Sequence, residues 1–141
     1  MTDKEKFEGF KEKLVKDNEE KYGKEIREKY GVETIERSNK MFQNMTKEQF
    51  DNFTLLGNEI NSTLLEAFKT GDPSSELSQR VAKMHKDWLS YTWPNYTKEA
   101  HGGLAQMYVE DERFTAYYDN NQPGLAAFLR DAIFVFTGKD K

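Results

Sequence analysis

The chain has 141 residues, no cysteine and a formal net charge of −4 from 25 acidic and 21 basic side chains. This length fits one domain, and the lack of cysteine excludes disulfides, thiolate metal sites and cysteine nucleophiles. An acidic chain without a basic stripe is a poor binder of nucleic acid, because that affinity depends largely on neutralising phosphates. No apolar run approaches the ~20 residues of a membrane span and the charged N-terminus lacks a signal-peptide core, so we expect a cytoplasmic protein.

The first 40 residues differ from the rest of the chain. More than half of them are charged, whereas most of the aromatic residues follow later. Residues 2–5 have the form of a capping box, which predicts a helix that begins near Asp3. We expect residues 1–40 to form a charged helical arm or lid and residues 41–141 to form the core of one domain. Two interpretations of the arm stay open: a solvated, weakly docked helix, and a flap that folds onto a ligand.

Residues that favour the start or the end of a helix predict two helices in the next segment. Residues 32–43 are expected to form a short helix. Thr46 and Gln49 make a second capping box, which opens a helix that continues to Gly71. Gly57 lies on the apolar face of this helix, where glycine normally lowers helix stability. We favour close packing against a neighbour as the reason for Gly57 over space left for a ligand.

Two further helices are predicted from Asp72 and Thr97. Asp72 can serve as the N-cap of the first of them and Pro73 as its first helical residue. Pro94 disfavours a helical conformation at Trp93, so this helix is expected to end about there. Thr97 can then cap the helix that follows.

Residues 104–136 contain the strongest helix pattern in the chain. Apolar side chains recur at steps of three or four in its second half and so share one helical face. These residues are Leu125, Phe128, Leu129, Ala132, Ile133 and Phe136. Pro123 suits the first helical position and Gly138 suits the left-handed residue that ends the helix. The acidic run at residues 110–112 predicts a junction between two shorter helices, and the lack of strand-like alternation predicts an all-α fold of about five to seven helices.

The chain has two histidines, His85 and His101. A zinc site needs three or four ligands at suitable spacing, which the sequence lacks, so no metal or other cofactor is expected. A histidine on an aromatic helical face could bind haem, which stays the alternative, whereas a packed, hydrogen-bonded His85 is the simpler interpretation. His101 precedes two glycines, so its neighbourhood could line a pocket. No nucleophile is paired with a base, and we therefore expect no enzyme.

Aromatic residues are dense at one predicted helix end and in the loop after it. They are Trp88, Tyr91, Trp93 and Tyr96. One interpretation is that these rings belong to the core. The other is a binding site, because loop aromatics are harder to explain by packing and amphipathic rings suit large, flat, partly polar compounds.

Two C-terminal segments, MYVEDERF at residues 107–114 and PGLAAFLRDAI at residues 123–133, resemble the signature of TipAS-type antibiotic-recognition domains. The resemblance extends backward through KYGKEIREKYG at residues 21–31 and KFEGF at residues 6–10, so it covers nearly the whole chain. Such domains are the ligand-binding parts of a subgroup of MerR-type transcription regulators. The resemblance implies a globin-like helical bundle with an N-terminal arm that is mobile without ligand.

The resemblance also implies a function, which is the non-covalent binding, and so sensing or sequestration, of large hydrophobic or aromatic antibiotics or drugs. Some members capture the ligand through a cysteine just after the position of His101, where this chain has Gly102 and Gly103. A DNA-binding domain would accompany the chain in a full-length regulator, but this chain alone is expected to bind neither nucleic acid nor membrane. The expected ligand-binding residues are His85, Trp88, Tyr91, Trp93, Tyr96, His101, Leu104, Tyr108 and Phe114. A haem-binding sensor and an interaction module whose arm forms a dimer seam are the other classes considered.

Overall fold

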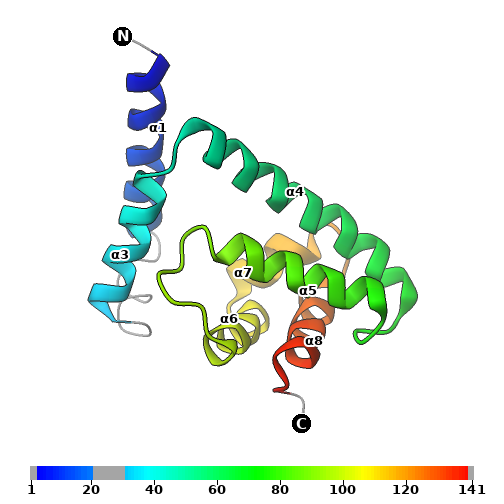
Figure 1. Cartoon of the computed structure of the whole chain (residues 1–141). Coiled ribbons are helices and arrows are strands. Elements are labelled where there is room, and N and C mark those ends of the chain that lie inside the picture. The colour runs from blue at the N-terminus through cyan, green and yellow to red at the C-terminus, as the bar shows by residue number, and fades with distance from the viewer. Residues whose placement is uncertain (1–2, 21–30, 140–141) are drawn as a thin grey trace. The chain divides into compact units, whose positions relative to one another are not determined.

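Figure 1 shows the computed structural model, which describes residues 3–20 and 31–139. Within these ranges the chain forms helices and turns but no strand, which confirms the all-α prediction. The helices are α1 (Asp3–Asn18), α3 (Val32–Gln43), α4 (Lys47–Thr70), α5 (Glu76–Leu89), α6 (Lys98–Glu110), α7 (Glu112–Asp119) and α8 (Leu125–Thr137). The motif at residues 21–31 lies almost wholly outside the described residues.

Of the helices in the described residues, none is both long and apolar enough to cross a membrane. The chain divides into two compact units. The first contains Met1–Phe53 and Ser90–Asn95, and the second contains Thr54–Leu89 and Tyr96–Lys141. Helix α4 therefore begins in the first unit and continues in the second. The assignment of residues 1–40 as an arm and residues 41–141 as a core stays a prediction.

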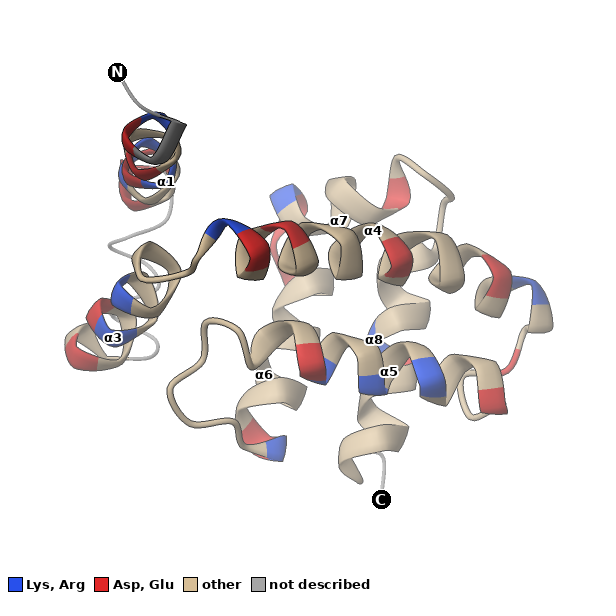
Figure 2. Cartoon of the chain, turned by 45° about the horizontal axis from the view of Figure 1, so that its top comes forward, with Lys and Arg blue, Asp and Glu red and all other residues tan. Residues whose placement is uncertain are grey.

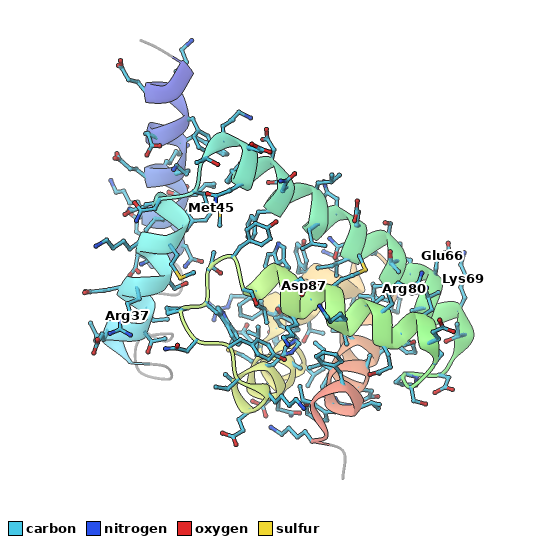
Figure 3. All side chains as sticks on the ribbon, viewed as in Figure 1. Arg37, Met45, Glu66, Lys69, Arg80 and Asp87 are labelled. Atoms are coloured by element: carbon cyan, nitrogen blue, oxygen red, sulfur yellow. The ribbon has the colours of Figure 1, made fainter. Side chains whose placement is uncertain are left out.

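A buried lysine joins α1 to the connection between α3 and α4 in the first unit. The side chain of Lys11 is only 1% exposed. Its Nζ donates to the carbonyl oxygens of Gln43 and, at 2.7 Å, of Met45, and lies 3.1 Å from the carboxylate of Glu8. Met45, labelled in Figure 3, is itself buried. This contact joins α1 to the end of α3. Both helices also carry acidic and basic residues (Figure 2).

Several aromatic rings pack together in the described part of the first unit. The ring of Phe50 packs edge-on against Phe7 at 5.3 Å, Phe10 at 5.8 Å and Phe42 at 5.9 Å between centroids. Edge-to-face packing of this kind stabilises by more than the buried area alone. Phe50 of α4 thus contacts apolar side chains of both α1 and α3.

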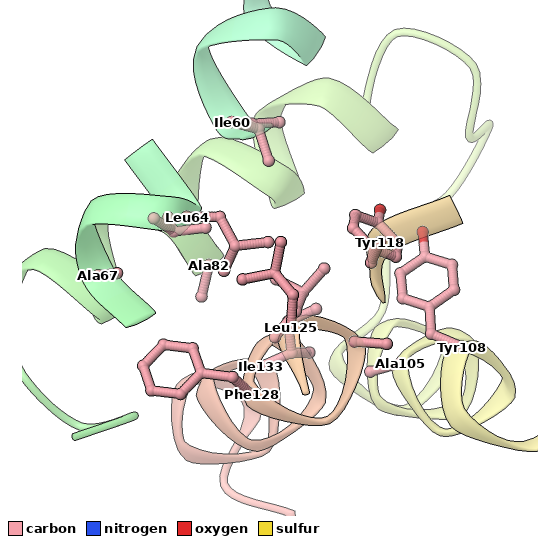
Figure 4. Close-up of a cluster of buried hydrophobic side chains, with 13 residues drawn as sticks. Ile60, Leu64, Ala67, Ala82, Ala105, Tyr108, Tyr118, Leu125, Phe128 and Ile133 are labelled. Atoms are coloured by element: carbon pink, nitrogen blue, oxygen red, sulfur yellow. The ribbon is translucent and has the colours of Figure 1, made fainter. Parts of the chain in front are cut away.

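Helix α8 lies at the centre of the second unit, as its apolar face predicts. Leu125, Leu129 and Ile133 are completely buried, and α8 packs against α5, α6 and α7. Figure 4 shows Leu125 and Ile133 in one cluster with Ile60 and Leu64 from α4. The burial of this face agrees with the apolar pattern that the sequence shows at residues 125–136.

Several helix ends agree with the local sequence signals. Gln49 N–H donates to Thr46 Oγ1 at 3.1 Å and Thr46 N–H donates to Gln49 Oε1 at 2.9 Å, which is a complete capping box. Gly71 and Gly138 adopt φ of 70° and 78°, the left-handed conformation that ends a helix with little cost only at glycine. Thr97 Oγ1 accepts from Ala100 N–H at 3.0 Å and so caps α6.

The predicted limits of α5 are wrong at both ends. Asp72 does not cap the helix, because its carboxylate accepts from Ser74 N–H and Ser74 Oγ within a turn. Ser75 caps it instead, accepting from Ser78 N–H at 3.1 Å, so the helix begins at Glu76. At the other end the helix stops at Leu89 rather than near Trp93. The hydroxyl-bearing residues that follow Leu89 favour turns over helix, so the chain leaves the helix before Pro94 requires it.

The predicted start of α8 is also wrong. Pro123 lies in a turn, and the helix begins at Leu125 after Gly124, whose φ is 89°. Asp119, at the end of α7, accepts from Ala126 N–H at 2.9 Å. The carboxylate that caps this helix therefore comes from the preceding helix, and a cap of that kind has no local sequence signature.

Candidate functional site

Four polar aromatic side chains lie in a connected series in the second unit. Tyr96 precedes α6, His101 lies in the first turn of α6, and Tyr108 lies two turns later in the same helix. His85 comes from α5, and its ring lies nearly parallel to the ring of His101, with ring centroids 5.0 Å apart and an interplanar angle of 5°. The spacing of seven residues places His101 and Tyr108 on one face of α6, where both meet His85.

Hydrogen bonds connect these four side chains in series. Tyr96 Oη lies 2.6 Å from His101 Nδ1, His101 Nε2 lies 2.9 Å from His85 Nδ1, and His85 Nε2 lies 3.1 Å from Tyr108 Oη. Both ring nitrogens of each histidine therefore have a partner. A buried polar group without a partner is costly, and the series satisfies all four ring nitrogens inside an aromatic core.

Burial keeps the two imidazoles of this series uncharged. His101 is 0% exposed, His85 1% and Tyr108 5%, whereas Tyr96 is partly exposed. Burial lowers the pKa of His85 to about 3, with the neighbouring His101 adding to the effect. Burial, followed by the positive charge of Lys86, lowers the pKa of His101 to about 4. Burial also raises the pKa of the Tyr96 hydroxyl. Both imidazoles are therefore neutral near pH 7.

The geometry does not fit the haem alternative. An axial histidine must offer a ring nitrogen to the iron, and both nitrogens of His85 and His101 are engaged with side chains. Among the described residues there is also no group of three or more histidine, aspartate and glutamate side chains that could hold a metal ion. The structure instead shows His85 as a packed, hydrogen-bonded residue.

Trp88 explains the glycine inside α4. A Cβ added at Gly57 would lie 3.2 Å from Nε1 of Trp88, closer than most real contacts. The indole also lies 5.8 Å from the His85 ring, between centroids. Close packing, rather than space for a ligand, is therefore the reason for Gly57.

The other predicted ligand-binding residues fall into both units. Leu104 and Phe114 are partly buried against the core of the second unit, where Phe114 lies 5.7 Å from the Tyr108 ring. Tyr91 and Trp93 belong to the first unit and are also partly buried, and Tyr91 packs on Phe53 at 5.6 Å between centroids. Of the predicted residues, the structure brings His85, Trp88, Tyr96, His101, Tyr108 and Phe114 into one set of contacts.

Two neighbours of this set were not apparent from the sequence. The ammonium of Lys86 lies 4.9 Å from the centroid of the Tyr96 ring, a cation–π contact. Lys139 covers Gly102 so closely that an added Cβ would lie 2.9 Å from its Cδ. The Lys139 side chain therefore occupies the space beside Gly102, whereas a Cβ at Gly103 would meet nothing within 4 Å. Neither contact has a local sequence signal, because each joins different elements.

A separate open depression of about 330 Å³ lies in the second unit. Its lining residues come from the turn before α5 and the later part of α8. They are Asp72, Pro73, Ser74, Asp131, Phe134 and Val135. None of these residues was expected from the sequence to be part of a site.

The fold is similar to a solved structure that is described as nosiheptide in complex with TipAS, from a thiopeptide antibiotic multidrug resistance system of Streptomyces lividans. The two chains are 29% identical, the similarity covers 87% of each, and the TM-score is 0.71. This similarity establishes the class of protein, an all-α, globin-like helical domain. A family model described as the TipAS antibiotic-recognition domain matches residues 22–136, and the chain therefore belongs to that family.

Curated relatives support the same assignment. The HTH-type transcriptional activator TipA of Streptomyces coelicolor is 35% identical over 89 residues, which are 62% of this chain and 35% of the relative. The HTH-type transcriptional activator mta of Bacillus subtilis is 34% identical over 68 residues, which are 48% of this chain and 26% of the relative. The chain thus spans about a third or less of the relatives' length. The resemblance inferred from the C-terminal motifs is confirmed.

Proposed function

We propose that this chain binds a thiopeptide antibiotic, or another large and partly aromatic compound, without forming a covalent bond. The observation that carries the proposal is the similarity to TipAS in complex with nosiheptide, which extends over 87% of both chains. Non-covalent binding follows from the composition, because a chain without cysteine has no thiol that could attack the ligand.

The ligand is expected to contact the predicted residues that are partly exposed. They are Trp88, Tyr91, Trp93, Tyr96, Leu104 and Phe114. Burying one large aromatic side chain against a ligand contributes roughly 1.5–3 kcal/mol. Several such contacts are needed to reach the ~8 kcal/mol of a micromolar complex once the entropy of association is subtracted.

The buried residues of the predicted site need a different role. His85, His101 and Tyr108 would touch a ligand directly only if the described packing opened. We expect them to act on the ligand through Tyr96, to which their hydrogen bonds lead.

In a full-length regulator such binding would change transcription, and in a free domain it would sequester the compound. The curated relatives are named transcriptional activators, and a DNA-binding domain is the partner that this role requires. The function is therefore recognition rather than catalysis, and a cytoplasmic location suits it.

Calorimetric titration of the chain with nosiheptide tests the proposal. We expect a saturable one-to-one isotherm with a dissociation constant in the micromolar range or below, and full recovery of free protein after dialysis. A folded chain that gives no heat and no change in tryptophan fluorescence would refute the proposed binding. A mass increase that survives denaturation would instead refute its non-covalent character.

A further inference from the structure

The series of hydrogen bonds from Tyr96 to Tyr108 has a direction. A neutral imidazole carries one N–H and one bare nitrogen, so in each histidine one ring nitrogen donates and the other accepts. His101 and His85 share a hydrogen bond between Nε2 of the first and Nδ1 of the second, and only one of these two atoms can carry the proton. The tautomer of one ring therefore determines the tautomer of the other.

Only two arrangements satisfy every bond. In the first, Tyr96 donates to His101 Nδ1, His101 Nε2–H donates to His85 Nδ1, and His85 Nε2–H donates to Tyr108 Oη. In the second, all three bonds reverse, so Tyr96 Oη accepts from His101 and the Tyr96 proton is directed elsewhere. In the first arrangement the Tyr96 hydroxyl can therefore accept a hydrogen bond from a group outside the series, and in the second it can donate one to such a group.

We propose that His85 and His101 form a coupled tautomer pair that sets whether the Tyr96 hydroxyl donates to a bound compound or accepts from it. His85 is then a positioning residue: it is buried, and it acts on the ligand only through His101 and Tyr96. The coupled pair itself is a property of the free protein, whereas its effect on a ligand rests on the proposed binding function.

The surroundings of the pair support neutral, coupled tautomers. The packed neighbours are the rings of Trp88 from α5 and Phe136 from α8. The titratable neighbours are Lys86, whose positive charge disfavours protonation of His101, and the tyrosines at the ends of the series. Tyr118 from α7 extends the series through a hydrogen bond with Tyr108, and burial raises the pKa of Tyr118. Because each ring carries one proton, the two forms of the series differ only in which ring nitrogens carry these protons.

Two tyrosine variants should shift the protons of the histidine pair to opposite ring nitrogens. In Tyr108→Phe, His85 Nε2 loses its partner, and a bare nitrogen there costs less than an orphaned N–H. Both histidines should then carry their proton on Nδ1. In Tyr96→Phe, the same reasoning applied to His101 Nδ1 places both protons on Nε2. Tyr117→Phe is the matched control, because its hydroxyl is bonded to Asn61 outside the series.

Nitrogen-15 NMR of the imidazoles near pH 7 distinguishes these tautomers directly. We expect His85 and His101 to change together in each variant, in opposite directions for Tyr108→Phe and Tyr96→Phe, and to stay unchanged in Tyr117→Phe. A purely structural role for the pair would leave the tautomers unmoved. Unchanged His101 signals in folded Tyr108→Phe, or doubly protonated rings in the wild-type chain, would overturn the coupled pair.

Titration with nosiheptide then tests the effect on binding. If nosiheptide shifts the wild-type pair toward protons on Nδ1, then Tyr108→Phe should bind it more tightly, by about 5-fold, the equivalent of one neutral hydrogen bond. If nosiheptide shifts the pair toward Nε2, Tyr108→Phe should bind it more weakly by a similar factor. Tyr117→Phe should bind as the wild type does.

The outcomes separate the two proposals. Binding without any shift of the histidine signals, or with a shift whose direction disagrees with the affinity change in Tyr108→Phe, would overturn the inference while the proposed function stands. Failure of the folded wild-type chain to bind nosiheptide would refute the proposed ligand, and the tautomers of the free variants would still decide whether the pair is coupled.

Discussion

At the scale of single residues, partners in three dimensions decide what each aromatic side chain does. Phe128 is only 8% exposed and packs edge-on against Phe68 at 5.5 Å between centroids. Trp93 lies in the connection between α5 and α6 and is partly exposed. The two residues look equally apolar in the sequence, but they should differ in their effect on stability and on ligand binding.

Alanine variants at these two positions test that difference. Phe128→Ala should lower the free energy of unfolding by ~3–5 kcal/mol, because it leaves a cavity in the core. Trp93→Ala should leave the melting temperature nearly unchanged and weaken nosiheptide binding. Thermal melts and calorimetry on both variants measure the two effects. If Trp93→Ala melts as early as Phe128→Ala, Trp93 is a core residue and the proposed role in binding is misplaced.

The two buried histidines predict how stability depends on pH. Their pKa values in the folded protein, about 3 and about 4, lie below the ordinary value of 6.5. Between about pH 6.5 and about pH 4 the unfolded chain therefore binds more protons than the folded one. Stability is present above pH 6.5 and is lost as the pH falls through this window, with a slope of up to ~1.4 kcal/mol per pH unit for each histidine.

Urea unfolding between about pH 7 and about pH 4 measures this slope. A double variant, His85→Gln with His101→Gln, is the control and should unfold with a much flatter pH dependence in the same window. Hydrogen bonds with Ser74 and Arg113 lower the pKa values of Asp72 and Asp111 below the ordinary 3.8, so these carboxylates add to the slope only near pH 4. The contribution of the histidines is therefore measured between about pH 6.5 and about pH 5. Equal stability of the wild-type chain at both ends of the window would contradict neutral, buried histidines.

At the scale of elements, one buried polar side chain contributes to the docking of α1, beside the ring contacts of Phe7 and Phe10 with Phe50. Lys11 provides the hydrogen bonds to the α3–α4 connection, and α1 otherwise has a thin apolar face in which Phe10 is 50% exposed. A lysine buried in this way has no sequence pattern, since most lysines of α1 are solvated. The sequence suggested a weakly docked helix, and the structure shows that Lys11 gives this helix one specific contact.

Replacing Lys11 with methionine should loosen α1. Lys11→Met keeps the length of the side chain but leaves the carbonyls of Gln43 and Met45 without their donor, at a cost of ~1–3 kcal/mol. Amide hydrogen exchange in α1 should become roughly tenfold faster or more, while amides of α8 in the second unit exchange as before. Lys13→Met, at an exposed position of the same helix, is the matched control. Equal exchange in the two variants would show that Lys11 does not hold α1.

At the scale of the whole molecule, net charge and family membership predict what the chain does not bind. With a formal net charge of −4, the chain offers little to a phosphate backbone. We expect no mobility shift of duplex DNA at micromolar protein and physiological salt. A mobility shift that weakens as salt increases would contradict this expectation and would show that this chain contacts DNA by itself.

Much of the fold was predictable because its signals are local. The Thr46–Gln49 capping box, the Thr97 cap and the left-handed glycines at positions 71 and 138 each involve residues within one helical turn. The apolar face of α8 follows from its periodicity alone. The two wrong helix starts have different origins. Ser74 holds the Asp72 carboxylate in a turn, a local alternative that competes with the helix cap. Helix α8 takes its cap from Asp119, seven residues before the capped amide.

The sequence by itself determined the all-α class, the family and the aromatic character of the expected site, because these depend on composition, periodicity and motifs along the chain. Only the tertiary structure decided that His85 and His101 pair, that Tyr96 is the partly exposed end of their series and that Lys11 holds α1. These contacts join residues on different elements. Their hydrogen bonds form inside a packed core, where an unpaired polar group is costly, and no spacing in the sequence encodes such a pairing.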